Sequence, residues 1–200
     1  MSDTFLTLIR HARTEWNEQR RIQGQTDTPL TPQGELMAQK WGQALMHLGY
    51  DRILCSDLGR AYRTAEIINS FLSLPLEVDP RLREQDWGDW TGLTVEELRN
   101  MRTEVAEQEA KGFEFRPPGG ESRAETLKRS RFALLAAAIR NPCKYTLVVT
   151  HQGVLRALAY DLRGMKFTPK EKPPISKEYR KHEILCRNNI LSDFNLDVEF

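Results

Sequence analysis

The sequence predicts an α/β protein in which a mostly parallel sheet is covered by helices on both faces. Two apolar runs, residues 5–9 and 145–150, have the composition of buried strands, and a histidine follows the end of each. Segments with helical periodicity alternate with these and other short apolar runs, which is the order that βαβ units produce. The chain has 200 residues, enough for one compact domain with a sizeable core.

In the first half of the chain, the strand at 5–9 is followed by a polar stretch that we interpret as a loop with one short helix. A longer helix should begin after Thr31, because threonine is a favoured N-cap and Pro32 suits the first helical position. Gly49 should end this helix near Leu48. The remaining elements of this half are a strand, a helix capped by Ser56 or Asp57, and an edge strand, at residues 52–55, 56–71 and 75–78.

The second half of the chain begins with an irregular loop at 81–92 that carries three acids and two tryptophans. A single charged helix is expected over about 94–111. The strand at 145–150 leads directly into a helical pattern, and the tail after an irregular loop at 164–175 alternates enough to suggest one or two strands. A long helix predicted at about 124–140 precedes the strand at 145–150. Its four apolar positions are Leu127, Phe132, Leu135 and Ile139.

Charge and composition exclude several classes of protein. A formal net charge of +1 gives no basis for bulk attraction to nucleic acid or to a membrane surface. No apolar run approaches the length of a bilayer span, and the first residues lack the features of a secretory signal. Cys55, Cys143 and Cys186 are widely spaced and odd in number, so we interpret them as reduced thiols. We therefore expect a cytoplasmic protein, a monomer or a homodimer, that binds neither nucleic acid nor membrane.

Two histidines, His11 and His151, stand at the carboxyl ends of predicted parallel strands. Ligand crevices of open α/β sheets lie at that edge, so side chains distant in sequence can converge there. A lone histidine at a strand end more often has a structural role, and Arg10 with His11 could merely cap a strand beside solvent. Two histidines at equivalent places, one of them preceded by arginine, favour a functional site. The candidates for this crevice are Arg10, His11, Asn17, Arg60, Glu84, Thr150 and His151.

The chemistry of these candidates points to a phosphoryl group held by protein charges. Guanidinium groups match a phosphate dianion, and the sequence has no HExxH, Walker or GxGxxG motif. We therefore expect neither a metal nor a cofactor. One histidine could attack phosphorus while the arginines neutralise the developing charge. Glu84 could be desolvated by the nearby tryptophans and donate a proton to the leaving alcohol, although the same loop could equally plug the edge of the core.

Residues 10–17 resemble the RHGETxxN opening of the histidine phosphatase superfamily, also called phosphoglycerate mutase-like. Further segments resemble other motifs of that family in the same order, and together they span nearly the whole chain. These segments are residues 30–34, 56–65, 82–92, 119–122 and 149–154. The resemblance implies a three-layer α/β/α sandwich. It also implies a single domain over residues 1–200, with about 85–118 forming a loop and helix cap over the site.

The resemblance also implies a role for each matching residue. His11 would be the phosphorylated nucleophile and Glu84 the proton donor. Arg10, Arg60 and His151 would form the phosphate pocket, with Asn17 as an auxiliary donor. Further contacts with the substrate are expected from Gln23, Gly24, Thr150 and Gln152.

Three residues depart from the family's pattern without removing a catalytic group. Ala12 replaces the usual glycine after the nucleophile and could narrow the pocket floor. Arg13 replaces a usual glutamate and adds positive charge near the rim. Gln152 replaces the usual glycine after the second histidine, so its side chain could crowd or contact the substrate.

The expected activity is hydrolysis of a small phosphorylated metabolite, with turnover highest on the acid side of neutrality. Relatives of this size include α-ribazole phosphatases and sugar-phosphate phosphatases. The cofactor-dependent mutases of the family have a longer insertion between the acid and the second histidine, whereas only about thirty residues separate Gly88 from Gly119 here. The alternatives are mutase-type phosphoryl transfer and a catalytically idle phosphate-ligand sensor or interaction module. Several side chains could bind a second anionic group or could be solvated surface: Arg13, Gln23, Arg99, Arg102, Arg116 and Arg123.

Overall fold

The computed structural model describes residues 3–142, 144–176 and 179–200, and it is built around a six-stranded sheet with the order β3-β2-β4-β1-β5-β6. The four strands β1 to β4 pair with one another only in parallel, and β5, which pairs with β1, and β6 add an antiparallel edge. The sheet is therefore mostly parallel, as the sequence predicts. The predictions for the first two residues and for Cys143 lie outside the described residues. The strands are β1 (Thr4–Arg10), β2 (Arg52–Cys55), β3 (Leu76–Val78), β4 (Tyr145–Thr150), β5 (Lys181–Arg187) and β6 (Ile190–Val198).

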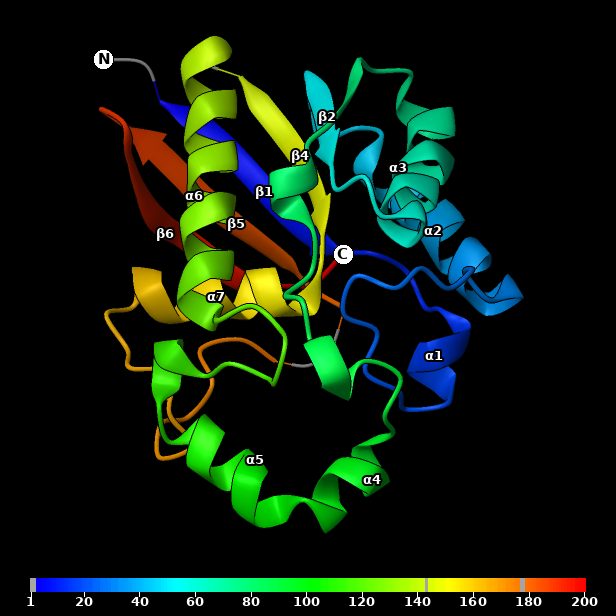
Figure 1. Ribbon diagram of the computed structural model, residues 1–200. Coiled ribbons are helices and arrows are strands. Elements are labelled where there is room, and N and C mark those ends of the chain that lie inside the picture. Colours follow the sequence, from blue (N-terminus) through cyan, green and yellow to red (C-terminus); the bar gives the residue numbers. More distant parts are fainter. Residues whose placement is uncertain (1–2, 143, 177–178) are drawn as a thin grey trace.

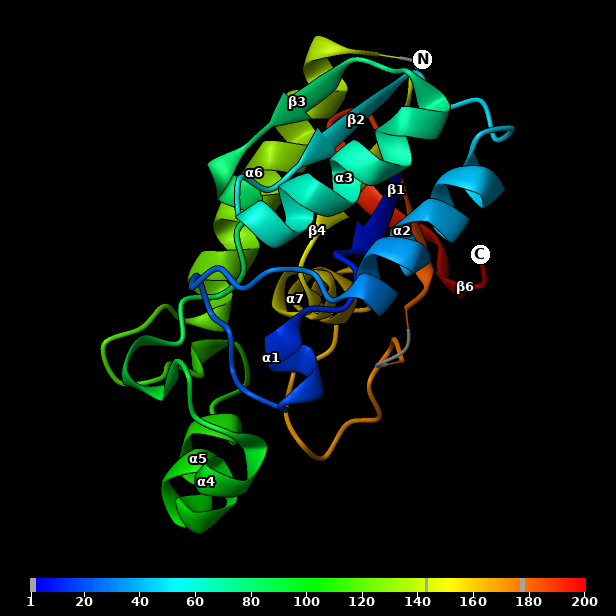
Figure 2. The ribbon, with the colours of Figure 1, turned by 90° about the vertical axis from the view of Figure 1, so that its right-hand side faces the viewer.

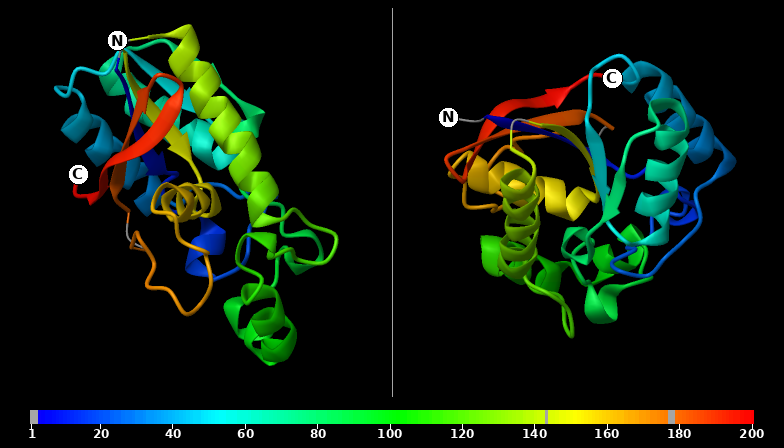
Figure 3. Two further views of the ribbon diagram at one scale, coloured as in Figure 1. Left: turned by 90° about the vertical axis from the view of Figure 1, so that its left-hand side faces the viewer. Right: turned by 90° about the horizontal axis from the view of Figure 1, so that it is seen from above.

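Four long helices cover the two faces of the sheet and produce the three layers. On one face lie α2 (Pro32–Leu45) and α3 (Gly59–Leu72), and on the other lie α6 (Arg123–Arg140) and α7 (Gln152–Leu162). Figures 1 and 3 show the two pairs on opposite sides of the sheet. Each face has its own apolar core, because successive side chains of a strand point to opposite faces.

The pairing of β1 with β4 brings the two histidines together. The parallel register aligns Arg10 with Thr150, and the next residues of the two strands are His11 and His151. The His11 backbone N–H donates to the Thr150 carbonyl at 2.9 Å, which extends the pairing by one more bond. Both imidazoles therefore begin at the same level of the carboxyl edge, although 139 residues separate them in the chain.

The helix ends show which local signals were reliable. Thr31 caps α2 through Gly34 N at 3.0 Å and Pro32 is its first residue, as predicted. The prediction that Ser56 or Asp57 caps α3 is wrong. The Asp57 carboxylate instead binds Arg83, and a carboxylate from a distant loop, that of Asp27, accepts from Gly59 N at 2.7 Å at the start of α3. A distant side chain thus takes the place of the local cap.

The segment expected to form a cap lies beyond the carboxyl ends of β1 and β4 (Figures 1 and 2). The single helix predicted at 94–111 is in fact two, α4 (Val95–Asn100) and α5 (Arg102–Glu109), with a break at Met101. Neither helix buries a side chain, so no apolar stripe holds a continuous helix against the body. The short elements of the molecule are α1 (Glu15–Glu18) and the 3₁₀ turns Pro80–Leu82, Gly88–Trp90 and Gly112–Glu114.

Candidate active site

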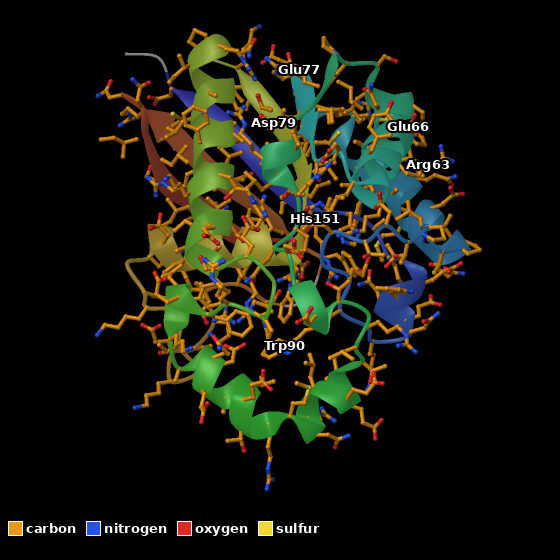
Figure 4. All side chains as sticks on the ribbon, viewed as in Figure 1. Arg63, Glu66, Glu77, Asp79, Trp90 and His151 are labelled. Carbon is orange, nitrogen blue, oxygen red and sulfur yellow. The ribbon has the colours of Figure 1, made fainter. Side chains whose placement is uncertain are left out.

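The centre of the site is the pair of imidazoles at the ends of β1 and β4. His11 is 2% exposed and His151 is fully buried, and their ring centroids lie 5.2 Å apart with the planes tilted by 53°. Figure 4 shows His151 near the middle of the molecule, at the junction between β4 and the cap segment. The two predicted histidines therefore form one site.

The orientation of the His11 ring is set by its neighbour in the chain. His11 Nδ1 lies 2.8 Å from the Ala12 carbonyl oxygen, which can only accept, so Nδ1 carries the hydrogen and Nε2 carries the lone pair. The Ala12 N–H in turn donates to Thr64 Oγ1 at 3.0 Å, and that hydroxyl donates to the Arg60 carbonyl at 2.7 Å. The loop that follows β1 is thus anchored to the first turns of α3.

Burial and charge favour the neutral form of both histidines. Desolvation lowers the pKa of His11 well below its usual value, and the nearby Arg10 and Arg60 guanidinium groups lower it further. Burial also lowers the pKa of His151, together with Arg60 and then His11. A neutral imidazole is the form that has a free electron pair for attack on phosphorus.

Arg10 and Arg60 both line the cavity beside His11. Arg60 is 2% exposed and donates from Nη1 to the Thr26 carbonyl at 2.8 Å and from Nη2 to the Gly24 carbonyl at 2.7 Å, which fixes its plane. Arg10 lies over the Tyr179 ring, 5.3 Å from its centroid. The Nε atoms of both arginines are buried and have no partner among the described residues.

Both ring nitrogens of His151 are also buried without a partner among the described residues. Buried polar groups of this kind are nearly always hydrogen bonded in proteins. Several unpartnered donors around one point are satisfied by a ligand that offers several acceptor oxygens, and a phosphoryl group does so.

Glu84 is held beside α7 by two backbone donors. Its Oε1 accepts from Gln85 N at 2.8 Å and its Oε2 accepts from Gly153 N at 3.1 Å. A Cβ atom at position 153 would lie 2.2 Å from Glu84 Oε1, so any larger residue there would displace the carboxylate. The structure therefore fixes the Glu84 carboxylate beside Gly153.

Behind Glu84, Arg129 of α6 binds the loop that carries it. Arg129 donates to the main-chain carbonyls of Arg81, Arg83 and Glu84 at 2.8, 2.6 and 2.9 Å. Both oxygens of the Glu121 carboxylate accept from Arg129 at 2.7 Å, and the pair is largely buried. This contact gives Glu121 of the 119–122 segment a structural role, because Glu121 orients Arg129 and Arg129 holds the loop of Glu84.

The cavity at this site has a volume of about 180 Å³ and contains most of the predicted residues. Gly24, with a φ of +51°, approaches Thr91 too closely for a side chain, since a Cβ atom there would lie 2.9 Å from Thr91 Oγ1. The predicted residues in its wall are Arg10, His11, Asn17, Gln23, Gly24, Arg60, Glu84 and Gln152. Its other lining residues, which sequence reasoning did not assign to the site, are Arg21, Ile22, Trp87, Gly153 and Arg156.

Asn17 and Gln23 each use their side-chain oxygen within the protein. Asn17 Oδ1 accepts from Thr14 N at 3.1 Å, and Gln23 Oε1 accepts from Thr28 Oγ1 at 3.1 Å. The amide nitrogens are left as donors, which suits an anionic ligand.

Three expectations need correction, and one open alternative can be narrowed. Thr150 does not line the cavity, because its buried hydroxyl donates to the Leu82 carbonyl at 2.8 Å. Ala12 packs in the core under α2 and α3, so its methyl group does not narrow the pocket. Arg13 lines a separate hollow of about 250 Å³ beside α2. None of the other arginines considered for a second anion lines the catalytic cavity: Arg99, Arg102, Arg116 and Arg123.

Two further findings concern the described part of the chain. No three of its His, Cys, Asp and Glu side chains come together in a way that could hold a metal ion. None of its helices has both the length and the apolar character needed to cross a membrane.

Taken together, the fold and the site define an α/β protein with two neighbouring buried histidines beside a cavity lined by arginines. The chain belongs to the histidine phosphatase superfamily (branch 1), whose sequence pattern matches residues 6–179. Among curated relatives, a protein of Cronobacter sakazakii named "Probable phosphoglycerate mutase GpmB" is 39% identical over 165 residues, which cover 79% of this chain and 74% of the relative.

Solved structures of the same superfamily share the fold over almost the whole chain. YhfR of Bacillus stearothermophilus superimposes with a TM-score of 0.87 at 30% identity over 98% of each chain. A mycobacterial glucosyl-3-phosphoglycerate phosphatase has a TM-score of 0.78 at 29% identity over 90% of each chain. The α-ribazole phosphatase of Shigella flexneri has a TM-score of 0.76 at 27% identity over 98% of each chain.

Proposed function

We propose that the protein is a metal-independent phosphomonoesterase that hydrolyses a small phosphorylated metabolite through a phosphohistidine on His11. The observation that carries this proposal is the hydrogen bond from His11 Nδ1 to the Ala12 carbonyl at 2.8 Å. It leaves Nε2 as the nucleophilic atom of a buried imidazole whose pKa is lowered mainly by desolvation.

In the first step, the Nε2 electron pair forms a bond to phosphorus as the bond to the ester oxygen breaks. Arg10 and Arg60 stabilise the negative charge on the equatorial oxygens. The departing alkoxide takes a proton from Glu84, which lies in the same cavity. The Ala12 carbonyl stabilises the cationic phosphorylated imidazole through the Nδ1 hydrogen bond.

In the second step, water gives a proton to the Glu84 carboxylate as its oxygen attacks phosphorus. The bond between nitrogen and phosphorus breaks, which releases inorganic phosphate and returns neutral His11. The protonated Glu84 is then ready for the next ester. His151, buried against His11, supplies a donor for the phosphoryl oxygens throughout.

The names of the curated relatives favour phosphoryl transfer between positions of phosphoglycerate as the second candidate. The short segment between the acid and the second histidine favours hydrolysis, because little chain is present to exclude water from the phosphoenzyme. Incubation with 2,3-bisphosphoglycerate separates the two, since a mutase would exchange the phosphoryl group with little phosphate release.

The central test uses p-nitrophenyl phosphate with wild type and His11→Ala, both in EDTA. We expect wild-type turnover to persist in EDTA and His11→Ala to lose it by about 10³-fold or more. Rapid quenching with a labelled substrate should give an acid-labile, base-stable adduct on His11. Robust turnover without that adduct would overturn the mechanism. Equal, negligible turnover in both proteins would favour a phosphate-ligand sensor.

A further inference from the structure

A second cavity adjoins the catalytic one and has a volume of about 440 Å³. Gln152 and Arg156 line both cavities, so the two share a wall on the first turns of α7. The rest of the second cavity is formed by the loop after α7, from Lys172 to Ser176. The catalytic cavity is the smaller of the two. A ligand larger than a phosphoryl group and the atoms next to that group therefore extends beyond this cavity.

Arg156 is placed to serve both cavities. It lies five residues after His151 on α7, and helical side chains lean toward the N-terminus of their helix, which here points at the site. Its guanidinium group lies 4.9 Å from the centroid of the Phe167 ring and 6.0 Å from that of Tyr160. These rings support the group, and no acid in the described part of the chain pairs with it.

The charged residues that the structure describes in the wall of the second cavity have one sign. They are Arg156 and Lys172, and no carboxylate is among the described lining residues. Pro173 and Pro174 make the opposite side stiff and partly apolar. Two cations in such a wall are suited to an anionic group, and the apolar side is suited to the carbon atoms that carry it.

We propose that this second cavity is the leaving-group subsite, and that the substrate is a phosphomonoester whose alcohol carries a second anionic group bound by Arg156 and Lys172. The inference rests on the proposed function, since it assumes that the phosphoryl group occupies the His11 cavity. Gln152, whose residue type departs from the family's usual glycine, is then the side chain between the two anions.

A pair of esters that differ in one charge tests the subsite. They are 4-carboxyphenyl phosphate and its neutral methyl ester, and the measured quantity is the ratio of their kcat/KM values. We expect the wild type to prefer the carboxylate by about tenfold, which is the size of one charge-assisted hydrogen bond. Arg156→Met should bring the ratio near one, Lys172→Met should lower it, and Arg156→Glu should invert it.

Lys170→Met is the matched control, because it removes a lysine from the same loop at a position that lines neither cavity. It should leave the ratio unchanged. A ratio near one in the wild type, or a ratio that neither Arg156→Met nor Lys172→Met alters, would overturn the subsite. A preference for the methyl ester would assign the cavity to an apolar group instead.

A binding measurement keeps this test separate from that of the proposed function. The dissociation constants of 4-carboxybenzylphosphonate and its methyl ester, which cannot be hydrolysed, should differ by the same factor in the wild type and in His11→Ala. Loss of this difference in Arg156→Met supports the subsite even in a protein without turnover. Equal affinities in wild type with normal phosphatase activity would refute the subsite alone.

Discussion

The carboxylate of Glu84 and the backbone N–H of Gly153 form a hydrogen bond of 3.1 Å that joins the acid's loop to the first turn of α7. Gly153 follows His151 by two residues, so this bond links the position of the proposed proton donor to that of the second histidine. The approach is close enough that a side chain at position 153 would displace the Glu84 carboxylate.

Gly153→Ala should therefore impair catalysis through Glu84. Its Cβ atom would lie 2.2 Å from Glu84 Oε1 and would displace the carboxylate. Displacements of this order cost about 10²-fold in rate. The loss of kcat should be larger for an alkyl phosphate, which needs a proton on its leaving group, than for p-nitrophenyl phosphate. If Gly153→Ala remains harmful in a protein that already carries Glu84→Gln, the effect does not pass through the acid.

Arg129→Met should also act through Glu84, because Arg129 donates to the main-chain carbonyls of residues 81, 83 and 84. We expect turnover of alkyl phosphates to fall more than that of p-nitrophenyl phosphate. Stability should fall by about 3 kcal/mol, since Glu121 is left largely buried without its partner. Urea unfolding measures the change in stability, and assays with the two substrates measure the change in turnover. Arg131→Met is the control, because Arg131 on the same helix pairs with Asp161 instead. An equal loss for both substrates would contradict a role in positioning the acid.

The two buried histidines should make stability fall in mild acid. Each has a pKa lowered well below 6.5 by burial, so the unfolded chain binds more protons than the folded protein just below that pH. The free energy of unfolding should therefore rise with pH up to about 6.5, and each histidine should contribute about 1.4 kcal/mol per pH unit. Urea unfolding from about pH 5 to about pH 7.5 should show a shallower slope for His151→Asn than for wild type. Equal slopes in the two proteins would mean that His151 is as protonated in the folded protein as in the unfolded chain.

Arg123→Met should loosen the cap segment. Arg123 is 4% exposed and lies 4.1 Å from the ring centroids of both Phe115 and Phe167, with Glu109 of α5 bound at 2.7 Å. Its loss should destabilise the protein by about 3 kcal/mol and expose α5 to limited proteolysis. The exposed pair of Arg116 with Glu125 offers the comparison, because solvent screens this pair and Arg116→Met should cost much less stability. Similar costs for both variants would contradict the anchoring role of Arg123.

The sequence was sufficient for the sheet and for the two histidines because both depend on local patterns. An apolar run that ends at a histidine identifies a strand and its carboxyl end together, and parallel pairing then brings His11 and His151 side by side. Gln23 and Gly24 were also placed correctly in the cavity wall.

The residues that sequence reasoning missed act across the fold. Arg129 and Arg156 lie on helices, where arginines at helical spacing are usually solvated, and only the tertiary structure shows what they face. The break of the predicted helix at Met101 and the exposure of Phe132 and Ile139 on α6 have the same origin. Apolar periodicity alone did not show that α4 and α5 bury no side chain or that α6 exposes part of its apolar surface.

The position of β4 between β1 and β2 bears on how the protein is made. Neither of these earlier strands pairs with the other, and each needs β4, which the ribosome delivers more than ninety residues after Cys55. A nascent chain that ends near residue 140 would leave β1 without either of its neighbours and β2 without one of its two, and unpaired strand edges are prone to aggregation. Synthesis must pass Arg156 before all the residues that line the proposed site are present, so the growing polypeptide depends on prompt insertion of its central strand.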